Sequence, residues 1–458
     1  MTANTLAQEI ESASISFSQL EKEHRPMLKL VEQLIGVVPN CDPLLEIWPT
    51  GFRTYNLLVA NLLNLPTSLL GGGGPKDLVG LAMYTSSRAA ECMYCSAHTC
   101  SFAIRRGVST DAITGDYTEL EAAVAAVAEG MARVPADLTA AQVVELRRHL
   151  SEDEVEWVIL GAALMGFLNK FMDTMGVELE EGAINDVKDL ITSTGWSTGK
   201  HAWTAEGVDE FLDPEPEGKP LIPGASATAE QSDGNSSNGS SNGQLGYKEI
   251  PKDSIGTYMR VMRQAPGALR RDKRWTKGMS SRPAMALMAL EEELGYAYNT
   301  LASLNHKRVV RAIATVIRDN MDDANSKLGV GPKCLIALVY ARVVGNEVLT
   351  AEAVQMAERL APEIGHRKLS AIGRFADADM TVANVPPGLS PVEAAVVMLT
   401  KSASPSPSEV NQITISVAAQ ALTPEQIIEA VVWLSVQQLL HRLYVFYEAD
   451  NELAPDQL

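Results

Sequence analysis

The sequence is poor in aromatic residues, in cysteine and in long apolar runs. Aromatic side chains make up 5% of its 458 residues, while Ala, Leu, Val, Glu and Met are plentiful, and this balance favours helix over strand. Five cysteines in so long a chain are too few for a disulfide framework. The longest apolar stretch, VILGAALMGFL, has the length of a core helix, because a membrane span needs about 18 apolar residues or more.

Positive charge is also scarce. The chain has 38 basic and 57 acidic residues, which gives a formal net charge of −19. A field of this sign repels phosphate backbones and anionic lipids, so we expect neither nucleic acid nor a membrane as partner. The opening residues, MTANTLAQEIESASISF, contain no basic segment followed by an apolar block, so no secretory signal is expected. Together with the few cysteines, this predicts a cytoplasmic protein, and in the cytoplasm a CxxC is more often catalytic or metal-binding than structural.

A segment with almost no apolar residues divides the chain. From Leu221 to Leu245 it reads LIPGASATAEQSDGNSSNGSSNGQL, dominated by Ser, Gly and Asn. Such a composition cannot bury an apolar face and is typical of a flexible linker. We therefore predict a domain over residues 1–222, a linker over 223–246 and a second domain over 247–458.

The two halves resemble each other in sequence. GPKDLVGL from Gly74 returns as GPKCLIAL from Gly331, an offset of 257. EAAV from Glu121 and LSEDEVEWVIL from Leu150 return at an offset of 272 as EAAV and LTPEQIIEAVV. We interpret this pattern as a tandem duplication. The change of offset predicts fifteen extra residues in the second copy, just where the first copy carries its CxxC, and we expect this copy to act as a scaffold.

Both halves carry the signals of helices. Ser151 with Glu154 three residues later forms a capping box, and Gly176 is placed to end the helix that follows. Alternation with a period of two residues is scarce throughout. An all-α fold is therefore predicted for both copies.

Reactive side chains gather in RAAECMYCSAHTCSFAIRRG, from Arg88 to Gly107. Cys92 and Cys95 lie three residues apart at a predicted helix start, where a thiolate is stabilised, and this spacing puts both sulfurs on one face. His98 follows one turn later on the same face, within reach to exchange a proton with a thiol. The pattern predicts a redox pair with its own acid/base group.

Two other interpretations of this cluster stay open. A structural zinc site needs four ligands, and Cys92, Cys95 and His98 supply three, with no second CxxC or HxxxH in the chain. Cys100 falls away from their face. The pair could also be inert, because free cysteine is among the most buried residue types.

The motif resembles that of a known family. CMYCSAHT followed by FAIRRG, the preceding KDLVGLAMY and the segment NKFMDTMGVELE from Asn169 to Glu180 are similar to the AhpD-like, carboxymuconolactone decarboxylase family of alkylhydroperoxidase-type thiol proteins. The resemblance covers about residues 25–185. It implies two tandem AhpD-like helical domains, of which the second is degenerate and lacks the CxxC.

The resemblance also implies roles for single residues. Cys95 would attack a peroxide, Cys92 would resolve the resulting sulfenic acid to a disulfide, and His98 would act as the base. The family's relay glutamate corresponds by pattern to Asp77, with Glu91 as a rival for this role. Two residues separate Cys95 from His98, where the family has three, and an aspartate stands in place of the glutamate.

The function implied is that of a thiol-dependent hydroperoxide reductase, an antioxidant peroxidase. It would need no metal or cofactor, and a dithiol protein would restore the Cys92–Cys95 disulfide to thiols. Members of the family assemble into rings, so a homo-oligomer is expected. Two alternatives remain: a lyase acting on a small carboxylate lactone, and a non-catalytic assembly protein whose cysteines sense oxidant.

Overall fold

The computed structural model describes residues 5–70, 74–185, 187–202, 255–295, 298–378 and 385–452. Within these ranges every regular element is a helix, which confirms the all-α prediction. The linker predicted at residues 223–246 lies outside the described residues, and so do the boundaries of the two predicted domains beside it.

The α-helices of the first half precede the predicted linker. They are α1 (Leu6–Ile10), α2 (Phe17–Ile35), α3 (Cys41–Leu45), α4 (Pro49–Leu62), α5 (Lys76–Ala89), α6 (Met93–Arg106), α7 (Thr110–Thr114), α8 (Glu119–Ala132), α9 (Ala140–His149), α10 (Glu152–Met175), α11 (Glu181–Ile184) and α12 (Lys188–Thr192). Short 3₁₀ turns lie at Glu11–Ala13, Thr67–Leu70 and Gly199–His201.

The α-helices of the second half follow the linker. They are α14 (Ile255–Trp275), α15 (Pro283–Leu294), α16 (Lys307–Met321), α17 (Val330–Val343), α18 (Glu347–Leu360), α19 (Gly365–Asp377), α20 (Pro391–Ala403), α21 (Gln412–Ala421) and α22 (Pro424–Asn451). Here 3₁₀ turns lie at Asn299–Ser303 and Pro362–Ile364.

The predicted helix ends are present where the sequence signals place them. Ser151 and Glu154 form the reciprocal capping box of α10. Gly176 ends α10 with φ 62°, and Gly107 ends α6 with φ 113°. Glycine adopts these left-handed angles without the steric cost that a side chain would bring.

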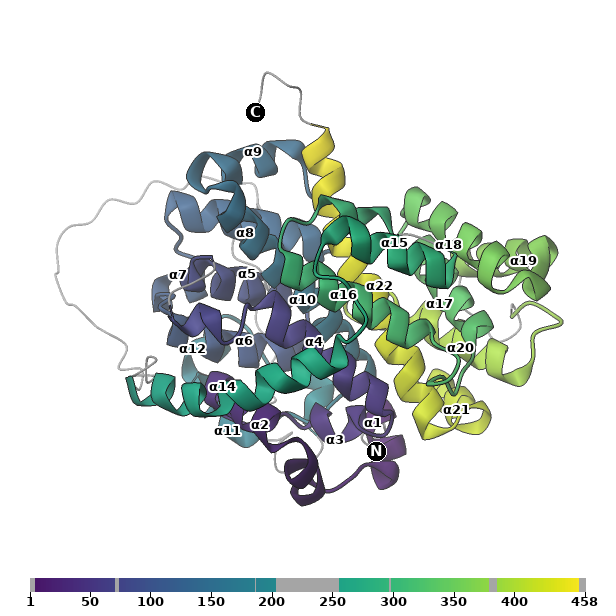
Figure 1. The fold of residues 1–458 in the computed structure, drawn as a ribbon, viewed down its shortest axis with the longest axis horizontal. Helices are drawn as coiled ribbons and strands as arrows, with labels where there is room; N and C mark the ends of the chain where they lie inside the picture. Colours follow the sequence, from purple (N-terminus) through teal and green to yellow (C-terminus); the bar gives the residue numbers. More distant parts are fainter. Residues whose placement is uncertain are drawn as a thin grey trace, which may run out of the picture.

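The two halves share one core, centred on the contact between α10 and α22 (Figure 1). Gly166 on α10 makes this close approach possible, because a Cβ there would stand 2.9 Å from the carbonyl oxygen of Gln438 on α22. By length and composition α10 could span a membrane, yet 94% of its apolar window is buried inside the protein. The apolar residues of α10 therefore pack in the shared core.

A second contact interlocks the halves. Although α14 follows the linker, it packs along α2 of the first half (Figure 1). Both helices contain an internal proline, Pro26 and Pro266, and a Cβ on Gly267 would stand 3.0 Å from the Pro26 ring. Two further helices, α4 and α16, also pack against each other across the halves.

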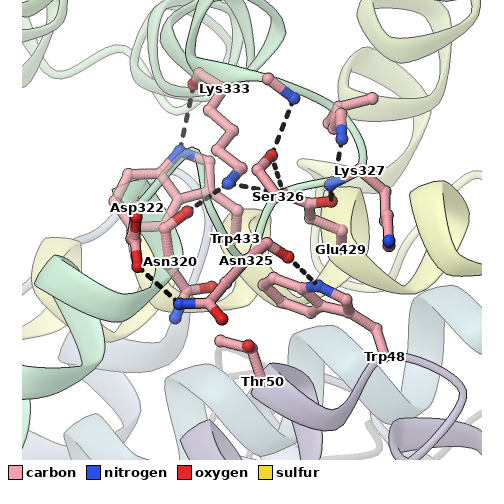
Figure 2. A network of polar contacts seen from close by, with 12 residues as sticks. Trp48, Thr50, Asn320, Asp322, Asn325, Ser326, Lys327, Lys333, Glu429 and Trp433 are labelled. Atoms are coloured by element: carbon pink, nitrogen blue, oxygen red, sulfur yellow. Dashed lines mark hydrogen bonds and ion pairs between the residues drawn. The ribbon is translucent and has the colours of Figure 1, made fainter.

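A buried polar network joins the second half to Trp48 of the first half (Figure 2). The Lys333 ammonium lies 2.5 Å from a Glu429 carboxylate oxygen, and both side chains are fully buried. Glu429 also accepts from the backbone N–H groups of Lys327 and Leu328, at 2.6 and 2.9 Å. Trp48 donates its indole N–H to the carbonyl of Asn325, two residues before Lys327. These bonds satisfy a buried charge pair that would otherwise be costly.

The helix bounds support the duplication and correct one detail of it. The first residues of α8, α9 and α10 correspond to those of α20, α21 and α22 at an offset of 272. Both ends of α5 and α6 correspond to those of α17 and α18 at an offset of 254, three less than the sequence pattern predicts. The extra residues of the second copy therefore lie between α18 and α20, a stretch that holds α19 where the first copy has the shorter α7. The prediction that they fall where the first copy carries its CxxC is wrong. The matching position is occupied by the first turn of α18.

Candidate functional site

The N-terminus of α6 is built around Cys92. Cys92 is the N-cap of this helix, and its sulfur accepts the backbone N–H of Cys95 at 3.3 Å. The chain reaches this cap through Glu91, which has φ 52°, an angle that side chains rarely adopt. The sulfur of Cys92 thus satisfies one of the free N–H groups at a helix N-terminus, where negative charge is favoured.

Cys95 and His98 line the same cavity. It has a volume of about 80 Å³, and its walls come from α2, α4, α5, α6 and α10, all in the first half. The lining is almost wholly apolar and includes Met83, Met165 and Phe102. Cys92 is fully buried and does not line the cavity, so Cys95 is the sulfur of the pair that faces it.

His98 is held by a carboxylate at the edge of this cavity. Its Nε2 lies 2.7 Å from Oε2 of Glu180, and both side chains are about nine-tenths buried. The hydroxyl of Tyr94 donates to Oε1 of the same carboxylate at 2.7 Å, and its ring lies against the imidazole, with centroids 4.5 Å apart. These three side chains form the polar corner of an otherwise apolar site.

Glu180 is kept ionised by its surroundings. The backbone N–H of Asn40 also donates to its carboxylate, and the Asn40 amide donates to the carbonyl of Glu178 at 3.0 Å. Burial opposes ionisation, but the charge and hydrogen bond of His98 outweigh it and lower the pKa of Glu180. The ionised carboxylate therefore accepts a hydrogen bond from His98 and fixes the position of its imidazole.

The two carboxylates predicted from the sequence lie elsewhere. Asp77 is exposed, and its Cβ lies near Gly107, at the C-terminal end of α6. Cys92 is at the other end of this helix, and fifteen residues at 1.5 Å each separate the two ends by roughly 22 Å. Glu91 precedes the N-cap and is not among the residues that line the cavity. The structure thus brings Cys92, Cys95 and His98 together and places Glu180, not Asp77 or Glu91, beside His98.

Burial governs the protonation of Cys95. Desolvation raises its pKa well above the usual range, and a hydrogen bond to Cys92 and the charge of that residue act in the same direction. Deprotonating Cys95 therefore requires a base close by. A third sulfur, that of Cys41, also influences Cys95. Cys41 is fully buried beside Tyr55, which lines the cavity.

Two further residues of reactive type, Cys334 and His441, are buried in the second half and do not line this cavity. All five cysteines, each within the described ranges, are free thiols. Cys334 lies in the core of the second half, where burial raises its pKa to about 12. His441 is 2% exposed and its Nδ1 lies 3.0 Å from the Tyr340 hydroxyl, so it is buried inside the second half.

Among the described residues one trio could offer three ligand atoms to a metal ion. The side chains of Glu23, His24 and Glu46 bring such atoms within 4.8 Å of one another. The guanidinium of Arg271 contacts Nδ1 of His24 and supplies the positive charge that a metal would bring. None of these residues belongs to the sulfur cluster.

The fold and the site together define a class: an all-α protein with a pair of free thiols at a helix N-terminus, one of which opens onto an apolar cavity. No family model matches the chain, and no curated protein matches it. Two solved structures are similar to it over 39% of its length: debrominase Bmp8 without ligand, and the C82A variant of the same debrominase in complex with 2,3,4-tribromopyrrole. Their identities are 24% and 23%, their TM-scores 0.35 and 0.34, and the matches cover 96% and 95% of those chains.

Proposed function

We propose that this protein is a thiol-dependent hydroperoxide reductase in which Cys95 attacks the peroxide and Cys92 resolves the product. The observation that carries the proposal is that Cys95 and His98 line one apolar cavity, while His98 is held by Glu180. An apolar cavity suits the organic part of an alkyl hydroperoxide. The histidine–carboxylate pair suits the proton transfers that its reduction requires.

The first step begins with a proton transfer. Cys95 passes its thiol proton to His98, and the resulting thiolate attacks the outer oxygen of the hydroperoxide. The O–O bond breaks, an alkoxide leaves, and His98 returns the proton to give the alcohol. Cys95 becomes a sulfenic acid, oxidised by two electrons.

The second step closes the disulfide. The thiolate of Cys92 attacks the sulfur of the Cys95 sulfenic acid, and hydroxide leaves and takes up a proton to form water. The N-cap position of Cys92, one turn before Cys95, puts both sulfurs at the same end of α6. An external dithiol protein in the cytoplasm then reduces the disulfide by thiol–disulfide exchange.

The alternative of a lyase acting on a carboxylate lactone has less support. Such a substrate needs a cation to hold its carboxylate, and the cavity lining contains neither lysine nor arginine. The one ionisable nitrogen base in the lining, His98, is engaged by Glu180. The sensor alternative differs from the peroxidase in its turnover of hydroperoxide. A sensor consumes one equivalent as its cysteines are oxidised, whereas a peroxidase continues to consume hydroperoxide while a reductant is present.

The test is a thiol count and intact mass before and after one equivalent of an organic hydroperoxide, followed by turnover with dithiothreitol as reductant. We expect loss of two thiols and two mass units, mapped to Cys92 and Cys95, and continued consumption of hydroperoxide. The Cys95→Ser variant should lose both effects. Unchanged thiols in the wild-type protein would overturn the proposal, and oxidation without turnover would favour the sensor.

A further inference from the structure

A second cavity lies where the two halves meet, beside the C-terminal part of α22. It has a volume of about 220 Å³, compared with about 80 Å³ for the cavity beside Cys95. The first half contributes the loop between α8 and α9, with Pro135, Ala136 and Leu138. The second half contributes α22 and the turn between α17 and α18. Pockets for small molecules occur preferentially at such junctions.

In the second copy this cavity lies at the position where the first copy carries Cys92. Asn346 lines the cavity and is the N-cap of α18, as Cys92 is the N-cap of α6. His441 lines it as well, and the equivalent of His441 at the offset of 272 is Asn169. Cys92 and Asn169 are 0% and 2% exposed, whereas Asn346 is half-buried. The second copy is therefore open at a position that is closed in the first.

A buried histidine presents an unused nitrogen in this cavity. The Nδ1 of His441 lies 3.0 Å from the Tyr340 hydroxyl, and its Nε2 has no hydrogen-bond partner among the residues that the structure describes. Burial and the charges of Arg442 and Lys170 lower the pKa of His441 to about 3, so the imidazole is neutral. In the tautomer that donates from Nδ1 to Tyr340, Nε2 is an acceptor. A side chain that is 2% exposed and keeps an unused acceptor indicates a missing donor.

Two carboxylates line the same cavity without a counterion. Glu448 and Glu452 lie one turn apart on α22, both are exposed, and neither forms an ion pair within the described part of the chain. Burial and the charge of Glu452 raise the pKa of Glu448, and like charges at this spacing repel each other. The cavity lining contains neither lysine nor arginine. A cation bound between the two carboxylates would relieve their repulsion.

The spacing along α22 defines the shape of a molecule that could use both features. The side chains that α22 contributes are four, three and four residues apart and so share one face of the helix: His441, Val445, Glu448 and Glu452. Seven residues at 1.5 Å each place Glu448 roughly 10 Å along the axis from His441. Val445 lies between them, and Leu138 adds a second apolar wall.

We propose that this cavity binds a small amine whose ammonium group lies between Glu448 and Glu452 and whose far end carries a hydroxyl that donates to Nε2 of His441. The apolar middle of the molecule, such as an aromatic ring, packs on Val445 and Leu138. No residue of the sulfur site takes part, so the inference does not rest on the proposed peroxidase function. It gives the second copy a binding role of its own, and the bound molecule contacts both halves.

The probe for this site is tyramine, which carries an ammonium group and a phenolic hydroxyl at opposite ends of an aromatic ring. Isothermal titration calorimetry on the reduced full-length protein should show saturable binding of one tyramine per chain. Phenethylamine lacks the hydroxyl, and tyrosol has an alcohol in place of the amine. We expect each analogue to bind about 5-fold more weakly than tyramine, because each loses one hydrogen bond or one partly exposed ion pair.

Three variants assign these contacts to residues. Glu448→Gln should weaken both amines by about 5-fold and leave tyrosol unchanged. His441→Asn should weaken tyramine to the affinity of phenethylamine and leave phenethylamine unchanged, and this unchanged binding also shows that the variant is folded. Ala136→Leu fills the cavity from a loop of the first half and should abolish the binding of both amines. Cys95→Ser should bind tyramine as tightly as the wild type, whatever the outcome of the peroxidase test.

The matched control is Glu292→Gln. It removes an exposed carboxylate from α15 that does not line the cavity, and it changes the net charge by the same amount as Glu448→Gln. This control should leave the Kd of tyramine unchanged. Equal losses in the two variants would overturn the inference, because the amine would then respond only to the net charge of the chain.

Three further results would also overturn the inference. The first is the absence of saturable tyramine binding to the wild-type protein, and the second is equal affinity for tyramine and tyrosol. Neither of these depends on the folding of a variant. The third is tyramine binding that survives Ala136→Leu, because the molecule would then lie in the apolar cavity beside Cys95.

Discussion

At the scale of single residues, Glu180 holds His98 in position for the proton transfers of the proposed reaction. The carboxylate lies 2.7 Å from Nε2 and also accepts from Tyr94, which fixes its orientation. A histidine paired in this way can take a thiol proton and return it to a leaving alkoxide without losing its position.

Replacing Glu180 by Gln should therefore lower hydroperoxide turnover by about 100-fold, because a positioned acid/base group contributes about this much. The measurement is kcat/KM with an organic hydroperoxide and dithiothreitol. Asp77→Asn and Glu91→Gln serve as controls, since neither residue lies beside His98 in the structure. A large loss of kcat/KM in Asp77→Asn and none in Glu180→Gln would instead support Asp77 as the relay carboxylate, as the sequence predicts.

The sequence predicts the local part of this site and misses the distant part. Cys92, Cys95 and His98 lie within two turns of one helix, so helical spacing alone places them together. Glu180 follows a different helix, 82 residues from His98. It stands at the end of the NKFMDTMGVELE segment, but only the packing of α10 beside α6 brings it to the imidazole.

At the scale of helices, the close crossing of α10 and α22 depends on Gly166. A Cβ at this position would stand 2.9 Å from the carbonyl oxygen of Gln438 and 3.0 Å from Cδ of Arg442. Any side chain there forces the two helices apart and moves the guanidinium that lies between them.

Gly166→Ala should thus destabilise the protein by about 1–3 kcal/mol, the usual cost of overpacking a core. Urea unfolding measures this change. The control is Gly373→Ala on α19, where a Cβ meets no atom within 4 Å and the backbone is helical. That variant should be neutral or slightly stabilising, since alanine is the better helix former. Equal effects at both positions would contradict the close-contact explanation.

Asp173, near the C-terminus of α10, links the two halves through charge. It is 5% exposed, pairs with Lys200 and accepts the backbone N–H of Ser408 from the second half. Burial works against the ionised carboxylate, but His201, Lys200 and the Ser408 N–H outweigh it and lower the pKa of Asp173. A carboxylate with a depressed pKa stabilises the fold above its unfolded value of about 3.9, and this contribution disappears as the pH falls below it.

Asp173→Asn should cost about 2 kcal/mol at pH 7, the size of a hydrogen bond to a charged group. The variant should also lose less stability than the wild type between pH 5 and pH 2.5. Urea unfolding across this range gives both quantities. Parallel pH profiles for the two proteins would show that Asp173 contributes nothing to the acid sensitivity.

The helices themselves were predictable, but their register between the copies was not. Capping residues and glycine stops mark the ends of α6 and α10 in the sequence. The offset of 257 between GPKDLVGL and GPKCLIAL differs from the helix offset of 254 by three residues, nearly one helical turn. Because positions three apart lie on the same face of a helix, the apolar pattern fits both registers, and the sequence alone cannot distinguish them.

At the scale of the whole molecule, the two copies are parts of one core. The contact of α10 with α22 and that of α14 with α2 both cross between the halves (Figure 1). One continuous apolar cluster contains residues from each half. The sequence predicted a duplication of helical units in which the second copy acts as a scaffold. It did not indicate how closely α22 would cross α10, because this depends on the glycine at position 166 meeting the backbone of Gln438. A homo-oligomer stays a prediction.

Separating the halves should show how far each depends on the other. We expect residues 1–222 produced alone to aggregate, because the face of α10 that packs on α22 would be exposed to water. Produced together with residues 247–458 as a second chain, they should form a 1:1 complex that reduces hydroperoxide, as measured by light scattering and turnover. A soluble, monomeric first half with wild-type turnover would contradict the dependence of the first half on the shared core.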